Sequence, residues 1–375
     1  MYLEWEQATG CLIDSAILEK LKNYQNIIIF GAGDSGDWTL EFLRQHDIFP
    51  RCYCDNSQQK WGKEKNGLFI RKFTDAVQEY EDAAICIASM WKEEIYRQIC
   101  AYNPLLSEHI YDMLTSMAWE TNQRLYESNE MDYIRKNMDA YENLHQALAD
   151  EQSKMVLEGV LNYRLTRKQE WLKKIRSKEN IYIDKVLLAK KQLKEIAGSI
   201  IIDGGAFDGD TVEMFSEMLG SRNNLNIHCY EADTANYEIL ENKITSDTYL
   251  PHNITLHKAA LWDKKGMIQF GGNGLSGCVG KGLGNYIPTE RIDDYPYEKV
   301  GLIKLDIEGA ERNALLGAVD TIKKYKPVLA VCAYHLQDDL LVLSDFIQSL
   351  DSDYKLFLRH YMLSAGDTVL YGISQ

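Results

Sequence analysis

The stretch IIIDGGAFDGDT, residues Ile200–Thr211, decides the fold of the C-terminal half of this 375-residue chain. Its isoleucines form the short apolar run typical of a buried parallel strand, and its glycines favour a tight turn into a helix. Turns of this kind commonly bind a pyrophosphate, but Asp203, Asp208 and Asp210 place negative charge around this one. We therefore expect a ligand that carries positive charge.

S-adenosylmethionine is such a ligand, because it has an ammonium and a sulfonium group and no phosphate. In an open α/β sheet the ligand lies beyond the carboxyl ends of the strands, and Asp203 would stand at such an end. Glu231 follows the next predicted strand in IHCYEAD, where a carboxylate can accept hydrogen bonds from both ribose hydroxyls. The alternative is that the glycines serve only the turn and that the acids cap helices.

Composition places the chain among globular proteins with more than one domain. Its formal charge of −15 is spread over both halves, which argues against a nucleic acid or an anionic membrane as the main partner. No apolar run is long enough to span a bilayer, and the start MYLEWEQ lacks the features of a signal peptide. We expect a cytoplasmic protein, not inserted in a membrane, that acts on a small molecule or glycan; a homo-oligomer is left open. Its eight cysteines show no metal-ligand spacing and are predicted to be free thiols.

Strand and helix signals predict an α/β protein in three parts. Residues 1–112 are predicted to form a smaller N-terminal Rossmann-like α/β domain that starts with a helix around Asp14–Asn23. Residues 113–197 carry apolar residues at helical spacing and are predicted to form a helical connector. Residues 198–375 show seven strand signals, of which the last two should form an antiparallel pair. The predicted strands are Asn26–Phe30, Arg51–Cys54, Ala83–Ala88 and His109–Tyr111 in the first part, and Ser199–Ile202, Asn226–Tyr230, Ile254–His257, Gly301–Asp306, Pro327–Ala333, Lys355–His360 and Thr368–Tyr371 in the last.

The stretch GLIKLDIEGAERNALLGA, Gly301–Ala318, together with IIIDGGAFDGDT, IHCYEAD and LHKAAL, resembles the FkbM family of S-adenosylmethionine-dependent methyltransferases. The resemblance covers about Ile181–Tyr371 and includes the first-turn motif DxGAxxG and the fourth-strand motif KLDxEGAE. It implies a seven-stranded Rossmann-like methyltransferase sheet and transfer of a methyl group to a hydroxyl of a sugar, glycan intermediate or similar natural product. The cofactor-binding residues expected from the turn and the resemblance are Asp203, Gly204, Gly205, Ala206, Asp208, Gly209, Thr211, Glu231 and Ala260.

Methyl transfer to a hydroxyl requires alignment of the two substrates and a group that takes the proton. Asp306, at the end of the domain's fourth strand, is the group nearest the expected methyl position. His335, just past the fifth strand, is the preferred base because an imidazole titrates near neutral pH, and His360 at the end of the sixth strand is the next candidate. The alternative is that Asp306 and Glu311 cap a helix and that His360 packs under the last strand.

Two features of this region allow more than one interpretation. Asp306, Glu308 and His335 could together hold a divalent metal, but these acids already have capping and acceptor-binding roles, so no metal is predicted. The segment FGGNGLSGCVGKGLGNY, Phe270–Tyr286, is too rich in glycine for a helix. It is interpreted as a lid or acceptor loop, or as a surface loop without a role.

IIIFGAGDSG carries the full GxGxxG pattern at Gly31, Gly33 and Gly36, with Asp55 at the end of the next predicted strand. By spacing this is a dinucleotide fingerprint. FGAG followed by CDNSQQKWG, Cys54–Gly62, also resembles the Rossmann-like domain that precedes some methyltransferases and sugar-modifying enzymes. NAD, a nucleotide sugar and no ligand stay open, so the alternative functions are an NAD(P)-dependent oxidoreductase and a nucleotide-sensing protein. The N-terminal part contains no YxxxK pair, which favours a docking or substrate-presenting domain.

Overall fold

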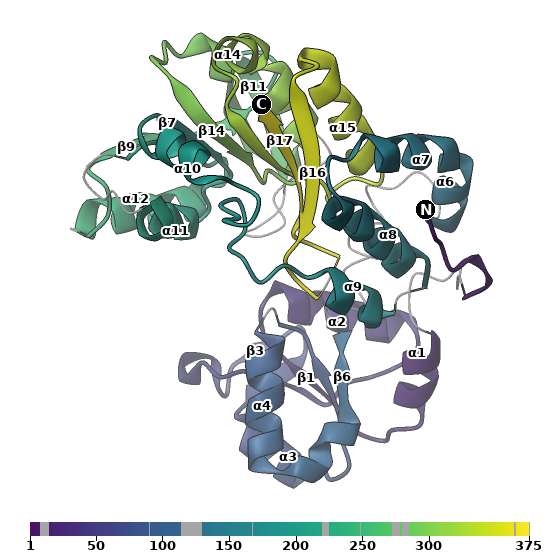
Figure 1. Cartoon of the computed structure of the whole chain (residues 1–375). Helices are drawn as coiled ribbons and strands as arrows, with labels where there is room; N and C mark the ends of the chain where they lie inside the picture. The colour runs from purple at the N-terminus through teal and green to yellow at the C-terminus, as the bar shows by residue number, and fades with distance from the viewer. Residues whose placement is uncertain are drawn as a thin grey trace. The chain divides into compact units, whose positions relative to one another are not determined.

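The structure is a computed structural model that describes residues 1–7, 15–89, 91–113, 130–166, 168–219, 225–247, 249–271, 278–279, 285–363 and 365–374 (Figure 1). The chain divides into two compact units. The first contains Met1–Leu3, Asp132–Leu161 and Glu170–Gln375, and the second contains Glu4–Met131 and Asn162–Gln169. Each unit is described separately.

The first unit is built on a seven-stranded sheet in the order β16-β17-β15-β14-β7-β8-β9. The five strands from β15 to β9 pair in parallel, whereas β17 runs antiparallel to both of its neighbours. The sequence analysis predicted all seven strands and the antiparallel last pair, and both are confirmed. The strands are β7 Ile200–Gly204, β8 Asn226–Tyr230, β9 Asn253–His257, β14 Val300–Leu305, β15 Val328–Cys332, β16 Tyr354–His360 and β17 Thr368–Ser374.

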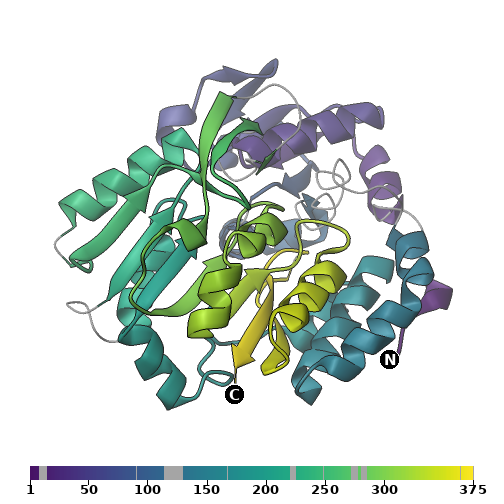
Figure 2. The ribbon, with the colours of Figure 1, turned by 90° about the horizontal axis from the view of Figure 1, so that it is seen from above.

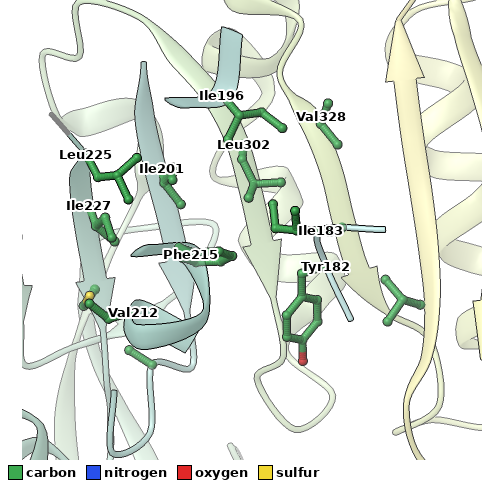
Figure 3. Packing of buried hydrophobic residues seen from close by; sticks show 14 of the residues in the cluster. Tyr182, Ile183, Ile196, Ile201, Val212, Phe215, Leu225, Ile227, Leu302 and Val328 are labelled. Atoms are coloured by element: carbon green, nitrogen blue, oxygen red, sulfur yellow. The ribbon is translucent and has the colours of Figure 1, made fainter. Parts of the chain in front are cut away.

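Helices cover this sheet because its strands are apolar on both faces. On one face, Phe215 of α11 packs in one cluster with Ile201 and Leu302 of the strands (Figure 3). Leu240 of α12 belongs to the same cluster. The residues that alternate with these, such as Ile202 and Ile303, are also buried. The helices are α10 Lys190–Ala197, which precedes β7, and α11 Asp210–Leu219, α12 Thr234–Ser246, α13 Glu311–Leu316, α14 Val319–Tyr325 and α15 Asp339–Leu350, which follow strands.

Part of the predicted helical connector belongs to the edge of this sheet. The Ala149 amide donates to the Leu356 carbonyl at 2.9 Å, and the Ser177 amide donates to the His360 carbonyl at 2.7 Å, so both segments lie along the edge strand β16. Helix α7 also packs beside α15 (Figures 1 and 2). These contacts cover part of an edge that could otherwise pair with another chain. The helices are α6 Glu130–Lys136, α7 Met138–Ala147, α8 Glu151–Thr166 and α9 Gln169–Ile175.

A small second sheet lies between β9 and β14 in the sequence and was not predicted. Its order is β10-β13-β11-β12, and β11 pairs antiparallel with β12 and β13. The expected lid segment Phe270–Tyr286 falls here: its two ends and its centre form strands, whereas residues 272–277 and 280–284 lie outside the described part. The strands are β10 Ala260–Leu261, β11 Gly266–Gly271, β12 Cys278–Val279 and β13 Asn285–Glu290, followed by the 3-10 turn η5 Ile292–Asp294.

The second unit has a six-stranded sheet in the order β3-β4-β2-β1-β5-β6. Five strands are parallel, and the short hairpin of β3 and β4, turned by Asn66 and Gly67 with positive φ, was missed from the sequence. The strands are β1 Ile27–Phe30, β2 Cys52–Cys54, β3 Glu64–Lys65, β4 Leu68–Arg71, β5 Ala84–Ile87 and β6 Ile110–Asp112. The helical elements are η1 Trp5–Gln7, α1 Ser15–Lys22, α2 Asp34–Gln45, η2 Gln58–Lys60, α3 Phe73–Glu79, α4 Lys92–Tyr102 and η3 Pro104–His109.

The structure also bears on the expectations about membrane spans and cysteines. Among the helices of the described ranges, none combines the length and apolarity needed to cross a bilayer. Six cysteines of the described part carry free thiols: Cys52, Cys54, Cys86, Cys100, Cys229 and Cys332. Cys11 lies outside the described residues.

Candidate active site at the carboxyl ends of the large sheet

The glycine turn after β7 is held tightly against the neighbouring strands. The amides of Gly205 and Ala206 both donate to the carbonyl of Tyr230, at 2.9 and 3.1 Å. Gly205 has a φ of +77°, and a Cβ at this position would lie 1.9 Å from the carbonyl oxygen of Asp306. Gly209 has a φ of +87°. Only glycine fits position 205, because both its backbone conformation and its contact with the end of β14 exclude a side chain.

Asp203 is fully buried, and its charge is balanced within the protein. Lys304 Nζ lies 3.0 Å from Asp203 Oδ1, and the Thr211 hydroxyl donates to the other carboxylate oxygen. Burial alone would lower the pKa of Lys304, but the carboxylates of Asp203 and Asp306 outweigh it and raise that pKa. The sequence analysis directed the charge of Asp203 at the ligand. The structure instead pairs it with Lys304, because an unpaired carboxylate at this depth would be strongly destabilising.

Lys304 also holds the turn itself. Its ammonium donates to the carbonyls of Gly204 and Gly205, at 3.1 and 2.6 Å. The residue is 1% exposed, so these donors stabilise backbone groups that water does not reach. Sequence reasoning missed this role, although Lys304 stands inside the KLDxEGAE motif on which the resemblance rests.

Glu231 joins the end of β8 to the glycine turn. Its Oε2 accepts the amide of Phe207 at 2.9 Å, and its Oε1 accepts the amide of Asp233 at 2.7 Å. Burial raises the pKa of Glu231, against the effect of these two amides. Each carboxylate oxygen accepts one backbone amide and has a second lone pair, which leaves capacity for two ribose hydroxyls.

The remaining residues predicted around the cofactor have local roles in the structure. Asp208 Oδ1 accepts the amide of Asp210 at 3.2 Å, and Asp210 Oδ1 accepts the amide of Thr211 at 2.7 Å. Both carboxylates therefore satisfy amides at the start of α11. Ala206 is fully buried in the core cluster, and Ala260 is buried in β10 of the small sheet.

Asp306, at the end of β14, receives two tyrosine hydroxyls that the sequence analysis did not identify. Tyr182 donates to its Oδ2 at 2.7 Å, and Tyr334 donates to its Oδ1 at 3.0 Å. Figure 3 shows the Tyr182 hydroxyl at the end of the apolar cluster, pointing away from the aliphatic side chains. Burial alone would raise the pKa of Asp306, but contact with His335 and the charge of Lys304 hold it well below its usual range. Asp306 is therefore an oriented anion.

His335 lies between two carboxylates. Its Nδ1 is 2.9 Å from Glu311 Oε1, and its Nε2 is 3.3 Å from Asp306 Oδ1. Burial opposes the charged form, but the charge of Glu311 and the contact with Asp306 outweigh it and raise the pKa of His335. Both nitrogens thus face acids. This geometry does not favour His335 as the base that takes a proton from an acceptor hydroxyl.

Further carboxyl groups lie near Asp306, Glu311 and His335. Burial and neighbouring acids raise the pKa of Glu308 to about 7, although 41% of its side chain is exposed. Burial and the charge of Glu311 raise the pKa of Asp339 to about 8, and burial and the charge of Asp306 raise that of Asp367 to about 7. Acidic side chains therefore gather around the ends of β14 and β15, and their raised pKa values mean that the neutral forms of Glu308, Asp339 and Asp367 are favoured more than in water.

His360, the second candidate base, belongs to the core. It is fully buried, and its Nδ1 lies 2.9 Å from the Thr368 hydroxyl across the β16–β17 pair. Burial lowers the pKa of His360 to about 4. Its neighbour Arg359 pairs with Asp150 at 2.7 Å rather than with the site. The alternative interpretation, packing under the last strand, describes His360 better, because a buried neutral ring cannot reach a substrate hydroxyl.

The N-terminal glycine turn is largely satisfied by its own unit. A Cβ on Gly31 would lie 2.3 Å from the Ala88 carbonyl, and one on Gly36 would lie 2.0 Å from the Gly31 carbonyl, so packing explains both glycines. Gly33 has open space around it. Asp55 Oδ2 accepts the Ala32 amide at 3.0 Å, so this carboxylate occupies one of the amides that a dinucleotide pyrophosphate would use.

Two ranges of the chain match known protein families. Residues 203–367 match the family described as Methyltransferase FkbM domain, and residues 23–104 match the one described as C2185-like, N-terminal. No curated protein matches the sequence. The crystal structure of methyltransferase FkbM from Methylobacillus flagellatus KT is 22% identical, with a TM-score of 0.64, and the match covers 97% of this chain and 94% of that chain. At this identity the likeness establishes the fold.

Two more distant structures align with about half of the chain. An rRNA methylase from Streptococcus thermophilus is 11% identical, with a TM-score of 0.35, covering 53% of this chain and 99% of that one. Aeropyrum pernix fibrillarin in complex with S-adenosyl-L-methionine is 11% identical, with a TM-score of 0.32, covering 48% and 68%. Neither score is high enough to support an argument. The family match spans the glycine turn, Glu231, Asp306 and His335, and the chain therefore carries a methyltransferase domain of the FkbM family.

Proposed function

We propose that the protein is a cytoplasmic S-adenosylmethionine-dependent O-methyltransferase that acts on a hydroxyl of a sugar, glycan intermediate or similar natural product. The observation that carries the proposal is the juxtaposition of the FkbM-type glycine turn with Glu231 at adjacent strand ends. Glu231 offers acceptors for the ribose, and the turn lets the backbone approach the cofactor closely. The choice of a sugar hydroxyl as the methyl acceptor rests on the sequence resemblance.

The pairing of Asp203 with Lys304 changes how the turn would bind the cofactor. With Asp203 paired to Lys304, Asp306 at the end of β14 is the carboxylate that would face the sulfonium and ammonium of the cofactor. Asp306 would accept a hydrogen bond from the acceptor hydroxyl or from the cofactor ammonium, while Tyr182 and Tyr334 keep its carboxylate in place. Methyl transfer is an in-line displacement, so this alignment is the main contribution of these residues.

The test is a calorimetric measurement of S-adenosylhomocysteine binding to the whole chain. Glu231→Gln should weaken binding by about tenfold or more, since it replaces a charged acceptor of the ribose hydroxyls. Glu290→Gln is the matched control, because Glu290 pairs with His257 and lies outside the turn. Equal affinity in the Glu231 variant would place the cofactor elsewhere. Mass spectrometry of candidate glycans incubated with cofactor and enzyme should then show a gain of one CH2 unit.

A further inference from the structure

We propose that Asp306, Glu311 and His335 form a binding site for a divalent cation of the Mn²⁺ type. Each residue offers one ligand atom, and these atoms all lie within 4.8 Å of one another. The three residues come from the end of β14, the start of α13 and the segment after β15, which the parallel sheet brings to one edge. The sequence analysis considered Asp306, Glu308 and His335 for a metal and predicted none. It did not consider Glu311 as a ligand.

Buried ligand atoms without hydrogen-bond partners are the second observation. Glu311 is 1% exposed, and its Oε2 has no hydrogen-bond partner within the described part of the chain. The ring nitrogens of His335, which is 4% exposed, face carboxylates but have no hydrogen bond of good geometry. Buried polar atoms are normally satisfied, and leaving them unpaired costs free energy. A cation would satisfy both residues at once.

Hydrogen bonds orient the carboxylates of Glu311 and Asp306 and leave oxygen lone pairs available to a cation. Glu311 Oε1 accepts the Ile307 amide at 2.8 Å, so Oε2 is the oxygen that remains for a cation. The hydroxyls of Tyr182 and Tyr334 fix the carboxylate of Asp306. Such contacts around the ligands commonly set the orientation and strength of a metal site. Only one nitrogen of His335 can bind the cation, and the other keeps its carboxylate neighbour.

The surrounding charge also favours a cation. Glu308 Oε2 lies 3.8 Å from His335 Nε2, and the Lys304 ammonium is paired with Asp203 at 3.0 Å. Buried carboxylates are stable when they are paired or coordinate a metal. Two carboxylate oxygens suit a hard divalent ion such as Mn²⁺, which also accepts one imidazole nitrogen, and the remaining coordination positions would be open to water or a substrate hydroxyl.

The test uses the whole chain, stripped with a chelator and titrated with Mn²⁺ in a calorimeter without cofactor or acceptor. We expect one bound equivalent, with an affinity at least tenfold lower in Glu311→Gln and His335→Gln. Glu290→Gln should bind like the wild type, because it alters a carboxylate 3.0 Å from another imidazole, that of His257. Equal affinity in Glu311→Gln, or no binding to the wild type, would overturn the proposal and leave His335 as a structural contact between Asp306 and Glu311.

A second measurement needs no variant and guards against misfolding of a substituted protein. Electron spin-echo spectroscopy of the Mn²⁺-loaded wild type should show modulation from a directly bound imidazole nitrogen. Its absence would show that bound Mn²⁺ lies elsewhere. The cation proposal, which concerns a site of the proposed methyltransferase, can be refuted independently of the proposed function. If the protein binds S-adenosylhomocysteine but no Mn²⁺, the cation proposal is wrong and the proposed function stands.

Discussion

Replacing Lys304 by methionine should destabilise the methyltransferase unit severely. The substitution removes the partner of a fully buried carboxylate, Asp203 Oδ1 at 3.0 Å, and the donor to the carbonyls of Gly204 and Gly205. Methionine keeps most of the volume, so the cost is electrostatic. Breaking a buried ion pair by removing one partner costs about 3–5 kcal/mol, which is a large share of a total stability of about 5–15 kcal/mol.

Urea unfolding at neutral pH, followed by circular dichroism, measures this cost. Lys326→Met is the matched control: Lys326 pairs with Asp351 and Asp353 at the surface, and its loss should leave the unfolding midpoint nearly unchanged. The double variant Lys304→Met with Asp203→Asn should recover part of the loss, because it leaves no unpaired charge. If Lys304→Met alone stays within about 1 kcal/mol of the wild type, Asp203 is not held as the structure shows.

Three further outcomes are expected. Gly205→Ala should lower the free energy of unfolding by about 3 kcal/mol or more, because Gly205 has a positive φ and contacts the Asp306 carbonyl. The control Gly33→Ala, which has open space around it, should change the urea midpoint far less, and similar midpoints would contradict this. Burial and the neighbouring His257 lower the pKa of His228 from 6.5 to about 4, so the unfolded chain binds a proton that the folded chain does not, and stability should fall on acidification through this window. From pH 7 to pH 5 this group should lower the free energy of unfolding by about 2 kcal/mol. His228→Phe should remove this pH dependence while it keeps a ring against His257, Tyr295 and Tyr297. An unchanged dependence would show that other groups cause it. A fragment of residues 130–375 should show a folded circular dichroism spectrum, whereas 177–375 should aggregate or unfold, because it lacks Leu148 and Arg176, which bridge to β16, and the Asp150 partner of Arg359. A well-folded shorter fragment would show that these contacts are dispensable.

The sequence by itself determined the α/β class, the seven strands and the antiparallel last pair. Buried strands are short apolar runs, and this local signal does not depend on the rest of the chain. The position of Gly205 and of Glu231 at strand ends followed from the same signal, because parallel strands bring their carboxyl ends to one edge. Weaker local signals failed: β3 and β10 are two residues long, too short for a recognisable period.

Tertiary structure alone decided which charges meet. The sequence shows Asp203, Lys304 and Glu311 as separate charges. In the fold Lys304 of β14 pairs with Asp203 of β7, and Glu311 pairs with His335. Tyr182 lies in the predicted connector and meets Asp306 only after the sheet has formed. His360 and His335 are alike in the sequence, yet one lies in the core and the other between two acids. The pKa of an imidazole depends on burial and on neighbouring charges, and both are set by the packed fold rather than by the residue or its position along the chain.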